Sequence, residues 1–398
     1  MTRSWTPPTD YWLYNQLYGS GAQYTDMTSK AIDVFLALDP ADPHYATATG
    51  YSTTEVDYRL LHGRLRYVAS KDSWKFALSS KTKPTKVQQG QYYVYGFIPR
   101  DAADEATLEQ LPASSTYADG AKLTIHGMNT TASDVCVIIG AREGFCTGAG
   151  TEGDPYIYYD GSWEDVTPGT ADVYDPGTDN RINRLRRGYF GYTLKTAFDE
   201  KGKSISAGNY MFLLFDHLCA ALSIHIRVDG DYHKLRHIKL KEITLQTKTA
   251  DGNFTTKTDV AVTLKANLDS SDPIESITYT PTPGETEPSS GTMFVNTDGH
   301  LLTPEYQTFI SHFMPQGVTT LVLTCVYDIY DTDTSKSTDG NLVRKDCKAT
   351  NTIPMKKVFD RFDSAERGRL YTIDLTIEPT YLYVMSERDL NNPEMVVN

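Results

Sequence analysis

The chain has 398 residues, and its 38 basic and 51 acidic side chains give a formal net charge of −13 at pH 7. This acidity argues against a nucleic-acid partner, because binding to phosphates needs clustered lysines and arginines. Hydrophobic residues make up 39% of the chain, and no apolar run reaches the roughly 18 residues that a membrane helix needs. The composition therefore predicts a globular protein long enough for two domains.

Strand patterns dominate in chain order. Apolar residues alternate with other residues along Ile32–Leu38, Gln91–Ile98 is dense in Tyr, Val and Phe, and Val135–Ile139 is a short apolar run. Further alternating runs follow at Ser223–Val228, Val260–Leu268 and Leu321–Ile329. A period of two is typical of strands, and the 27 tyrosines are strand formers. Between Leu240 and Ile243 the parity of the apolar positions changes, which predicts a β-bulge.

Helical patterns are rare in this sequence. Glu105–Leu111 and Thr303–Phe313 could each form a turn or two of helix, and polar connections rich in Gly, Pro and Asp separate the other runs. The pattern predicts an all-β fold with two β-sandwich domains. We place their boundary near residue 210, so that residues 1–210, with an aromatic extension at 1–30, precede a second domain at 211–398.

The C-terminal region raises a question of strand pairing. Apolar and polar residues alternate strictly from Tyr371 to Glu378, Pro379 interrupts the pattern, and Tyr381–Met385 is a second β-prone run. The last strand either completes its own sheet or offers an unpaired edge to another molecule.

The five cysteines form no CxxC pair and have no zinc-ligand spacing. Cys325 and Cys347 flank the polar turn Thr332–Gly340 of an expected hairpin, which would place them nearly opposite each other. A cross-strand disulfide is one interpretation for an exported protein, and two semi-buried free thiols are the other.

Sequence motifs for catalysis are missing. The chain has no GxSxG, HExxH, P-loop or dinucleotide fingerprint. Four histidines lie close together in sequence without the spacing of a known ligand frame: His217, His225, His233 and His237. We therefore expect no catalytic residues, no cofactor and no metal site, and we expect that the protein is not an enzyme.

Several phrases, taken in order, resemble one family. These are Gln91–Pro99, Phe215–Ile224, Phe313–Gln316, Val326–Asp331 and Gly368–Ile377. Together they are similar to the fimbrillins of Bacteroidales. The resemblance implies two tandem transthyretin-like β-sandwich domains, export as an outer-membrane lipoprotein precursor, and assembly into fimbriae (pili) at the cell surface.

In that family a protease cuts after an arginine that follows the first strand, and a partner's terminal strand fills the opened groove. Carried onto this chain, the first strand is Ala31–Leu38 and the candidate processing residues are Arg59, Arg64 and Arg66. Arg59 lies well beyond the strand, in the β-prone segment Val56–Leu61, so an ordinary strand arginine is the alternative.

The resemblance also implies a donor strand near the C-terminus. Its candidate apolar residues are Tyr371, Ile373, Leu375, Ile377, Leu382 and Val384, and a self-paired final strand is the alternative. The expected partners are other fimbrial subunits in a homo- or hetero-polymer, or host or bacterial surface ligands. We expect no nucleic-acid partner, and we expect contact with a membrane only through the precursor's lipid anchor. Without a cut, and with its end self-paired, the chain would suit a tip or accessory adhesin.

Two other functions are alternatives to a fimbrial role. A glycan-binding surface lipoprotein of β-sandwich fold would need an exposed aromatic platform, and the dense candidate is Tyr156, Tyr158, Tyr159 and Trp163, although such clusters more often pack a hairpin. A β-sandwich hydrolase would need a carboxylate pair with a raised pKa in a cleft, and no sequence feature indicates one.

Overall fold

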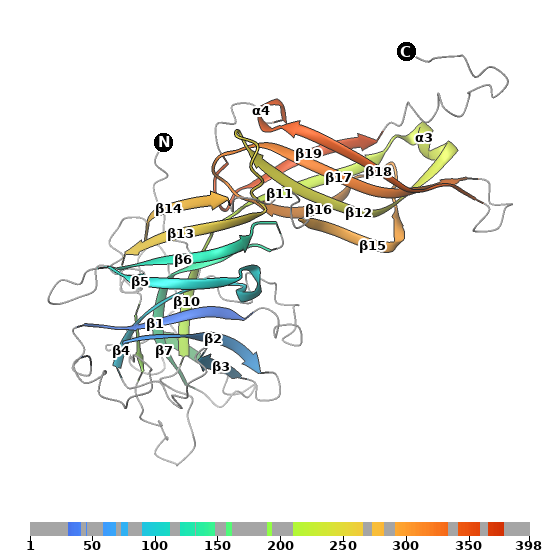
Figure 1. Ribbon diagram of the computed structural model, residues 1–398. Helices are drawn as coiled ribbons and strands as arrows, with labels where there is room; N and C mark the ends of the chain where they lie inside the picture. The colour runs from blue at the N-terminus through green and yellow to red at the C-terminus, as the bar shows by residue number, and fades with distance from the viewer. Residues whose placement is uncertain are drawn as a thin grey trace, which may run out of the picture. The chain divides into compact units, whose positions relative to one another are not determined.

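The computed structural model describes residues 31–40, 45, 59–68, 73–78, 90–111, 120–131, 133–147, 157–160, 189–192, 210–265, 273–281, 291–332, 341–358 and 365–377. Most of these residues lie in β-strands (Figure 1), so the predicted all-β fold class is confirmed. Among the described residues no helix is both long and apolar enough to cross a membrane. The chain divides into two compact units.

The first unit comprises Met1–Met128, Asp134–Leu218 and Thr258–Thr280. Its described strands form an eight-stranded sheet in the order β10-β7-β4-β1-β2-β3, with β8 paired to β7 and β9 paired to β4. The bounds are β1 Ile32–Leu38, β2 Leu60–Val68, β3 Ser73–Leu78, β4 Gly90–Ile98, β7 Cys136–Thr147, β8 Ile157–Asp160, β9 Tyr189–Tyr192 and β10 Tyr210–His217. A second sheet, β14-β13-β6-β5, contains β5 Glu105–Gln110, β6 Gly120–Asn129, β13 Lys257–Lys265 and β14 Ile274–Pro281. The short 3-10 helix η2 covers Arg100–Ala102.

The second unit comprises Asn129–Ser133, Cys219–Lys257 and Pro281–Asn398. Its three-stranded sheet, β16-β11-β19, contains β11 Ala220–Val228, β16 Gln307–Phe313 and β19 Leu370–Ile377. Its four-stranded sheet, β15-β12-β17-β18, contains β12 Arg236–Thr249, β15 Thr292–Leu301, β17 Val318–Asp331 and β18 Leu342–Pro354. Two short helices complete the described part, α3 Gly230–Leu235 and α4 Met355–Val358.

The core of the second unit is built from alternate residues of its two sheets. Leu222, Ile224 and Ile226 of β11 are buried, as are the inward residues of β12 (Ile238, Leu240, Ile243 and Leu245). Phe294 of β15 and Phe309 of β16 meet edge-to-face, with ring centroids 5.0 Å apart. Because these two strands belong to different sheets, the two buried faces share one core, as in a β-sandwich.

The path of the chain between the units is less simple than two tandem segments. The chain leaves the first unit after Leu218 rather than near residue 210, because β10 pairs along its length with β7. It then returns: β13 and β14 come from the C-terminal half but pair in the sheet of β5 and β6. Each unit is therefore assembled from segments far apart in the sequence.

Three local predictions meet two different outcomes. The bulge is confirmed, since β12 shifts register against both of its neighbours between Leu240 and Glu242. Both predicted helical turns are wrong, because Glu105–Gln110 is β5 and Gln307–Phe313 is β16. In β16, Phe309, Ser311 and Phe313 are buried, whereas Ile310 between the first two is exposed. This period-2 alternation of burial prevails over local helix propensity once a neighbouring strand is present to pair.

β1 occupies the interior of the eight-stranded sheet and packs tightly against β4. All seven of its residues are buried. Opposite Val34 lies Gly96 of β4, which has a φ of +152°, and a Cβ placed there would come within 1.9 Å of the Asp33 carbonyl oxygen. Only glycine allows the two backbones to approach so closely with that conformation.

We expect Gly96→Ala to lower the free energy of unfolding by about 1–3 kcal/mol or more, because the clash involves backbone that cannot rotate away. Urea unfolding of the full chain measures this effect. Gly230→Ala is the matched control, since a Cβ at Gly230 of α3 meets nothing within 4 Å. Equal stability of both variants would contradict the close approach of β1 and β4.

Candidate functional site

The described residues place β1 between two antiparallel partners. β2 pairs with it from Ile32↔Leu65 to Ala37↔Leu60, and β4 pairs from Asp33↔Phe97 to Leu38↔Tyr92. Its even-numbered residues join one hydrophobic cluster: Ile32, Val34, Leu36 and Leu38, together with Leu61, Tyr92, Val94, Ile98, Cys136, Ile138, Leu213 and Phe215. Both backbone edges and both side-chain faces of β1 are thus occupied.

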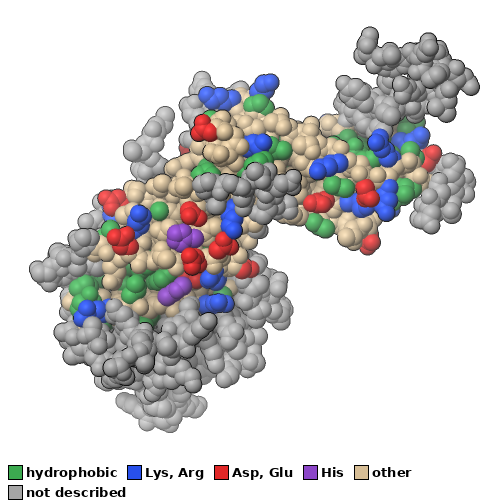
Figure 2. All heavy atoms as spheres, in the orientation of Figure 1, with side chains coloured by type: hydrophobic (Ala, Val, Ile, Leu, Met, Phe, Trp, Pro, Cys, Tyr) green, Lys and Arg blue, Asp and Glu red, His purple; other side chains and the backbone are tan. Residues whose placement is uncertain are grey.

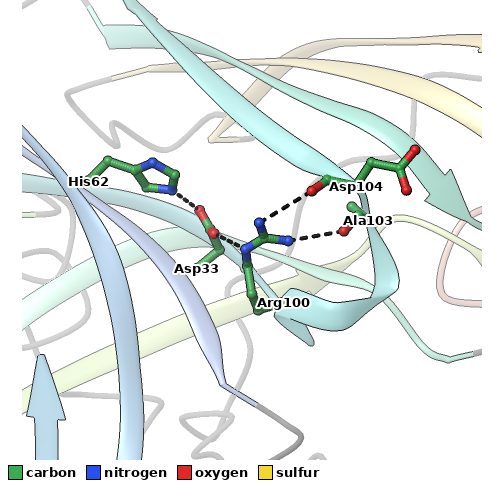
Figure 3. Close-up of polar contacts among 5 residues, drawn as sticks. All are labelled: Asp33, His62, Arg100, Ala103 and Asp104. Atoms are coloured by element: carbon green, nitrogen blue, oxygen red, sulfur yellow. Dashed lines mark hydrogen bonds and ion pairs between the residues drawn. The ribbon is translucent and has the colours of Figure 1, made fainter. Parts of the chain in front are cut away.

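One residue of β1 breaks its apolar character. Asp33 is fully buried, with an exposed fraction of 0%. Its Oδ1 lies 2.7 Å from Nε2 of His62 on β2, and its Oδ2 lies 2.6 Å from Nε of Arg100, which follows β4 (Figure 3). Arg100 also donates from Nη1 to the carbonyl of Ala103 at 3.0 Å and from Nη2 to that of Asp104 at 3.3 Å. The Asp33 carboxylate therefore links β1 to β2 and to the residue Arg100 that follows β4.

The surroundings fix this arrangement. The His62 ring stacks on Phe35 of β1 with centroids 4.0 Å apart and an interplanar angle of 5°. A buried charge is costly unless it is paired and hydrogen-bonded. The ion pair with Arg100 Nε supplies the opposite charge, and His62 supplies the hydrogen bond. Sequence reasoning did not single out these residues, although an aspartate inside the apolar run Ile32–Leu38 was a visible signal.

The three candidate processing residues occupy different positions. Arg59 lies in the turn immediately before β2, where its carbonyl accepts from the Leu38 backbone N–H at 2.8 Å. Its guanidinium lies 4.7 Å from the centroid of the Tyr45 ring. Arg64 is an exposed residue within β2, opposite Asp33. Arg66 lies further along β2, opposite Lys75. Only Arg59 lies in the connection between β1 and β2.

The candidate donor strand is split by the limits of the described chain. Tyr371, Ile373, Leu375 and Ile377 belong to β19, whereas Leu382 and Val384 lie outside the described residues. β19 is an edge strand of its sheet and pairs in parallel with β11 along one side. Among its described apolar residues only Ile373 is buried, while Tyr371, Leu375 and Ile377 are half-buried. β19 thus pairs within its own chain, with β11 as its one partner among the described strands.

Polar contacts also hold β19 to β11. His225 Nδ1 lies 2.9 Å from the Asp374 carboxylate, and Arg227 donates to the Thr376 hydroxyl at 3.0 Å. The Asp374 side chain is 59% exposed. Exposed pairs of this kind contribute little to stability, because water and salt screen them.

The two cysteines of the candidate disulfide lie on adjacent strands but are not directly opposite each other. Cys325 of β17 is opposite Ala349 of β18, and Cys347 is opposite Tyr327, so the two thiols are diagonal neighbours two residues out of register. Both are free thiols. Diagonal positions are about 7–8 Å apart, which exceeds the usual Cα separation of a disulfide. Burial raises the pKa of the Cys325 thiol to about 11, and burial also raises the pKa of Cys347.

The remaining candidate residues are scattered. Of the four histidines, His225 contacts Asp374, and His233 and His237 contact each other with ring centroids 4.8 Å apart. Trp163 and Tyr156 lie outside the described residues, and the side chains of Tyr158 and Tyr159 in β8 are likewise not described. On the face drawn in Figure 2, acidic and basic side chains of the described residues are interspersed rather than gathered by sign.

Comparisons with known proteins give distant structural similarities. No protein-family model matches the chain, and no curated protein matches it. A crystal structure from Bacteroides uniformis, described as a candidate cell adhesion protein, has 10% sequence identity and a TM-score of 0.32, with coverage of 90% of this chain and 89% of that chain. A fimbrial protein from Bacteroides vulgatus has 13% identity and a TM-score of 0.28, with coverage of 87% and 88%. A candidate adhesin from Bacteroides ovatus has 8% identity and a TM-score of 0.23, with coverage of 89% and 82%.

We expect Asp33→Ala to destabilise the chain by about 3 kcal/mol, the lower end of the range for a broken buried pair, because Arg100 and His62 keep partial contact with water. Urea unfolding measures the loss, and hydrogen exchange assigns it to β1 and its neighbours. Asp374→Ala removes a carboxylate with one histidine partner at an exposed position and should cost less than about 1 kcal/mol. Similar costs for both variants would contradict the role assigned to Asp33.

The free thiols lead to a labelling prediction. Iodoacetamide should modify Cys325 and Cys347 completely in denatured, unreduced protein, as peptide mass spectrometry would record. In the native protein Cys325 should react slowly, since a rise in pKa from 9.0 to about 11 leaves roughly 100-fold less thiolate near neutral pH. A Cys325–Cys347 crosslinked peptide would instead establish the disulfide.

Proposed function

We propose that the chain is a non-enzymatic subunit of a cell-surface fimbria, of the fimbrillin type, which assembles by exchange of a β-strand. The observation that carries the proposal is the position of β1: a buried interior strand joined to β2 through a connection that ends at Arg59. The sequence resemblance supports the fimbrillin family, and the position of β1 supports this strand as the place of exchange.

A cut after Arg59 would separate β1 from β2 without removing any residue of β2, which begins at Leu60. Cuts after Arg64 or Arg66 would divide β2 itself. Arg59 is therefore the favoured processing residue. After such a cut β1 is held by noncovalent contacts alone, and its departure leaves β2 and β4 with facing rows of unpaired backbone groups.

The strand that replaces β1 must meet two requirements. It must present apolar side chains at alternate positions, each contributing roughly 1.5–3 kcal/mol when buried. It must also present an acid where Asp33 lay, because His62 and Arg100 would otherwise face the groove without their carboxylate. Many β-strands would meet one of these requirements, but few sequences would meet both.

β19 of a second copy meets both requirements. Its segment Ile373–Ile377 aligns in the same direction with Ile32–Leu36, so that apolar residues coincide at alternate positions and Asp374 takes the place of Asp33. Among the described strands, β19 pairs with β11 along one edge, and most of its apolar side chains are half-buried. The groove offers two edges, with a net gain of about 1 kcal/mol for each added hydrogen bond. This difference favours donation once β1 has gone.

The proposed location is the cell surface, reached as a lipoprotein precursor, and the proposed partners are further fimbrial subunits. The stalk role depends on cleavage and donation. A chain that keeps β1, with β19 paired to β11, would act as a tip or accessory adhesin, whose ligand on host or bacterial surfaces would bind through its loops.

Limited digestion with trypsin tests the stalk role. We expect a cut after Arg59, loss of the preceding residues, and growth of ladders that native mass analysis and size-exclusion chromatography detect. Arg59→Gln should abolish both the cut and the ladders, whereas Arg64→Gln, a matched control within β2, should leave both unchanged. A chain that loses residues 1–59 and stays monomeric would contradict strand exchange.

A second arm of the experiment tests the donated sequence. A synthetic peptide of residues 370–378 should bind the cleaved protein lacking β1, as fluorescence anisotropy would measure. The Asp374→Asn peptide should bind at least about tenfold more weakly, since a hydrogen bond to a charged group is worth about 1.5–3 kcal/mol. Equal binding of the two peptides would show that the acid does not select the donor.

A further inference from the structure

Three side chains with metal-binding atoms meet at the ends of β7 and β10. Asp134 and Cys136 are separated by one residue where β7 begins, so they project to the same side of the extended chain. His217 is the last residue of β10 and lies directly opposite Cys136 in the antiparallel register. The Leu218 backbone N–H donates to the Val135 carbonyl at 2.8 Å and holds the two ends together.

The distances between the three groups are close to those of a coordination shell. His217 Nδ1 lies 3.4 Å from Cys136 Sγ and 2.8–2.9 Å from the Asp134 carboxylate oxygens. One ligand atom from each residue lies within 4.8 Å of the others. In tetrahedral zinc sites, bonds of about 2.3 Å to sulfur and 2.0–2.2 Å to nitrogen and oxygen separate the ligand atoms by roughly 3.3–3.6 Å. Small rotations of the side chains would accommodate an ion.

Burial of the cluster is graded. Cys136 is 1% exposed, whereas the side chains of His217 and Asp134 are 21% and 33% exposed. The sulfur lies deepest and the carboxylate lies nearest to solvent, so an ion would have a route of entry from solvent. The soft sulfur disfavours Mg²⁺ and Ca²⁺, which prefer oxygen ligands, and the set of one sulfur, one nitrogen and one oxygen suits Zn²⁺ or Co²⁺.

We propose that Asp134, Cys136 and His217 form a binding site for a divalent transition-metal ion, with zinc as the favoured metal. The ion crosslinks β7 to β10, an edge strand of the eight-stranded sheet. Because the ligands come together only in the folded chain, metal binding adds to the stability of the first unit. Cys136 also belongs to the hydrophobic cluster that packs against β1, but all three ligands come from β7, β10 and the residues beside them, and the proposed ion site does not depend on the proposed fimbrial role.

Sequence reasoning did not find this cluster. The search for ligand spacing treated His217 with the other histidines and gave it no metal partner. The signal was instead an Asp-x-Cys pair at one strand end and a histidine at the end of another strand 81 residues away. Without the register of β7 and β10 the two cannot be connected.

Titration of the reduced full chain with Co²⁺ tests the proposal. We expect one equivalent to bind, with the intense near-ultraviolet absorption of a cobalt–thiolate bond. Zn²⁺ should bleach this absorption and raise the melting temperature, and a chelator should reverse the rise. Failure of Co²⁺ and Zn²⁺ to bind would overturn the proposal and leave a hydrogen-bonded triad in which His217 contacts its two neighbours.

Variants separate this site from other metal-binding groups. Cys136→Ser should abolish the cobalt–thiolate absorption, and His217→Gln and Asp134→Asn should each weaken binding by about tenfold or more. His225→Gln is the matched control. His225 also contacts a carboxylate, that of Asp374 at 2.9 Å, but it lies in a different sheet. The double variant Cys325→Ala/Cys347→Ala should retain the absorption. Circular dichroism establishes that each variant is folded, and absorption that survives in folded Cys136→Ser would overturn the assignment.

Discussion

β1 is joined to both of its neighbours by backbone pairing and also by the Asp33 carboxylate. This carboxylate contacts His62 of β2 and Arg100, which follows β4. A charge with no exposed surface must keep its partners, because transfer from water to a protein interior is costly. The register of β1 is therefore set twice, once by the alternation of apolar residues and once by the position of this acid. A slip by one residue would turn Asp33 into the hydrophobic cluster.

If β1 is exchanged as proposed, this double constraint would hold the strand firmly and also select its replacement. Many β-prone sequences could form the backbone hydrogen bonds and bury the apolar side chains of β1. Contact with Arg100 and His62 additionally requires an acidic residue at the position of Asp33. Selectivity of this kind comes from the penalty for the wrong strand more than from attraction to the right one. The chain carries a second segment with the same pattern in β19, where the acid is exposed and contributes little.

The route of the chain has consequences beyond the fold. β13 and β14 return to the first unit after β11 and β12 have formed part of the second. Pairings of this kind join residues far apart in sequence, and such contacts form slowly because loop closure precedes them. β7 begins just after the chain re-enters the first unit at Asp134, and β10 ends just before the chain leaves it again after Leu218. An ion held by Asp134, Cys136 and His217 would fix these strand ends.

Alternation of apolar residues along Ile32–Leu38 and Leu321–Ile329, and the change of parity after Leu240, determined the all-β class, several strands and the bulge from the sequence alone. These are local properties, since a period of two and its interruption are written within a few residues. The predicted helical turns at Glu105–Leu111 and Thr303–Phe313 were wrong, because pairing with a neighbouring strand makes these segments β-strands. Only the tertiary structure decided that β10 belongs to the first unit, that Asp33 meets Arg100 and His62, and that His217 faces Cys136. Each of these depends on which distant strands pair and in what register, and a single strand's pattern contains no information about its partner.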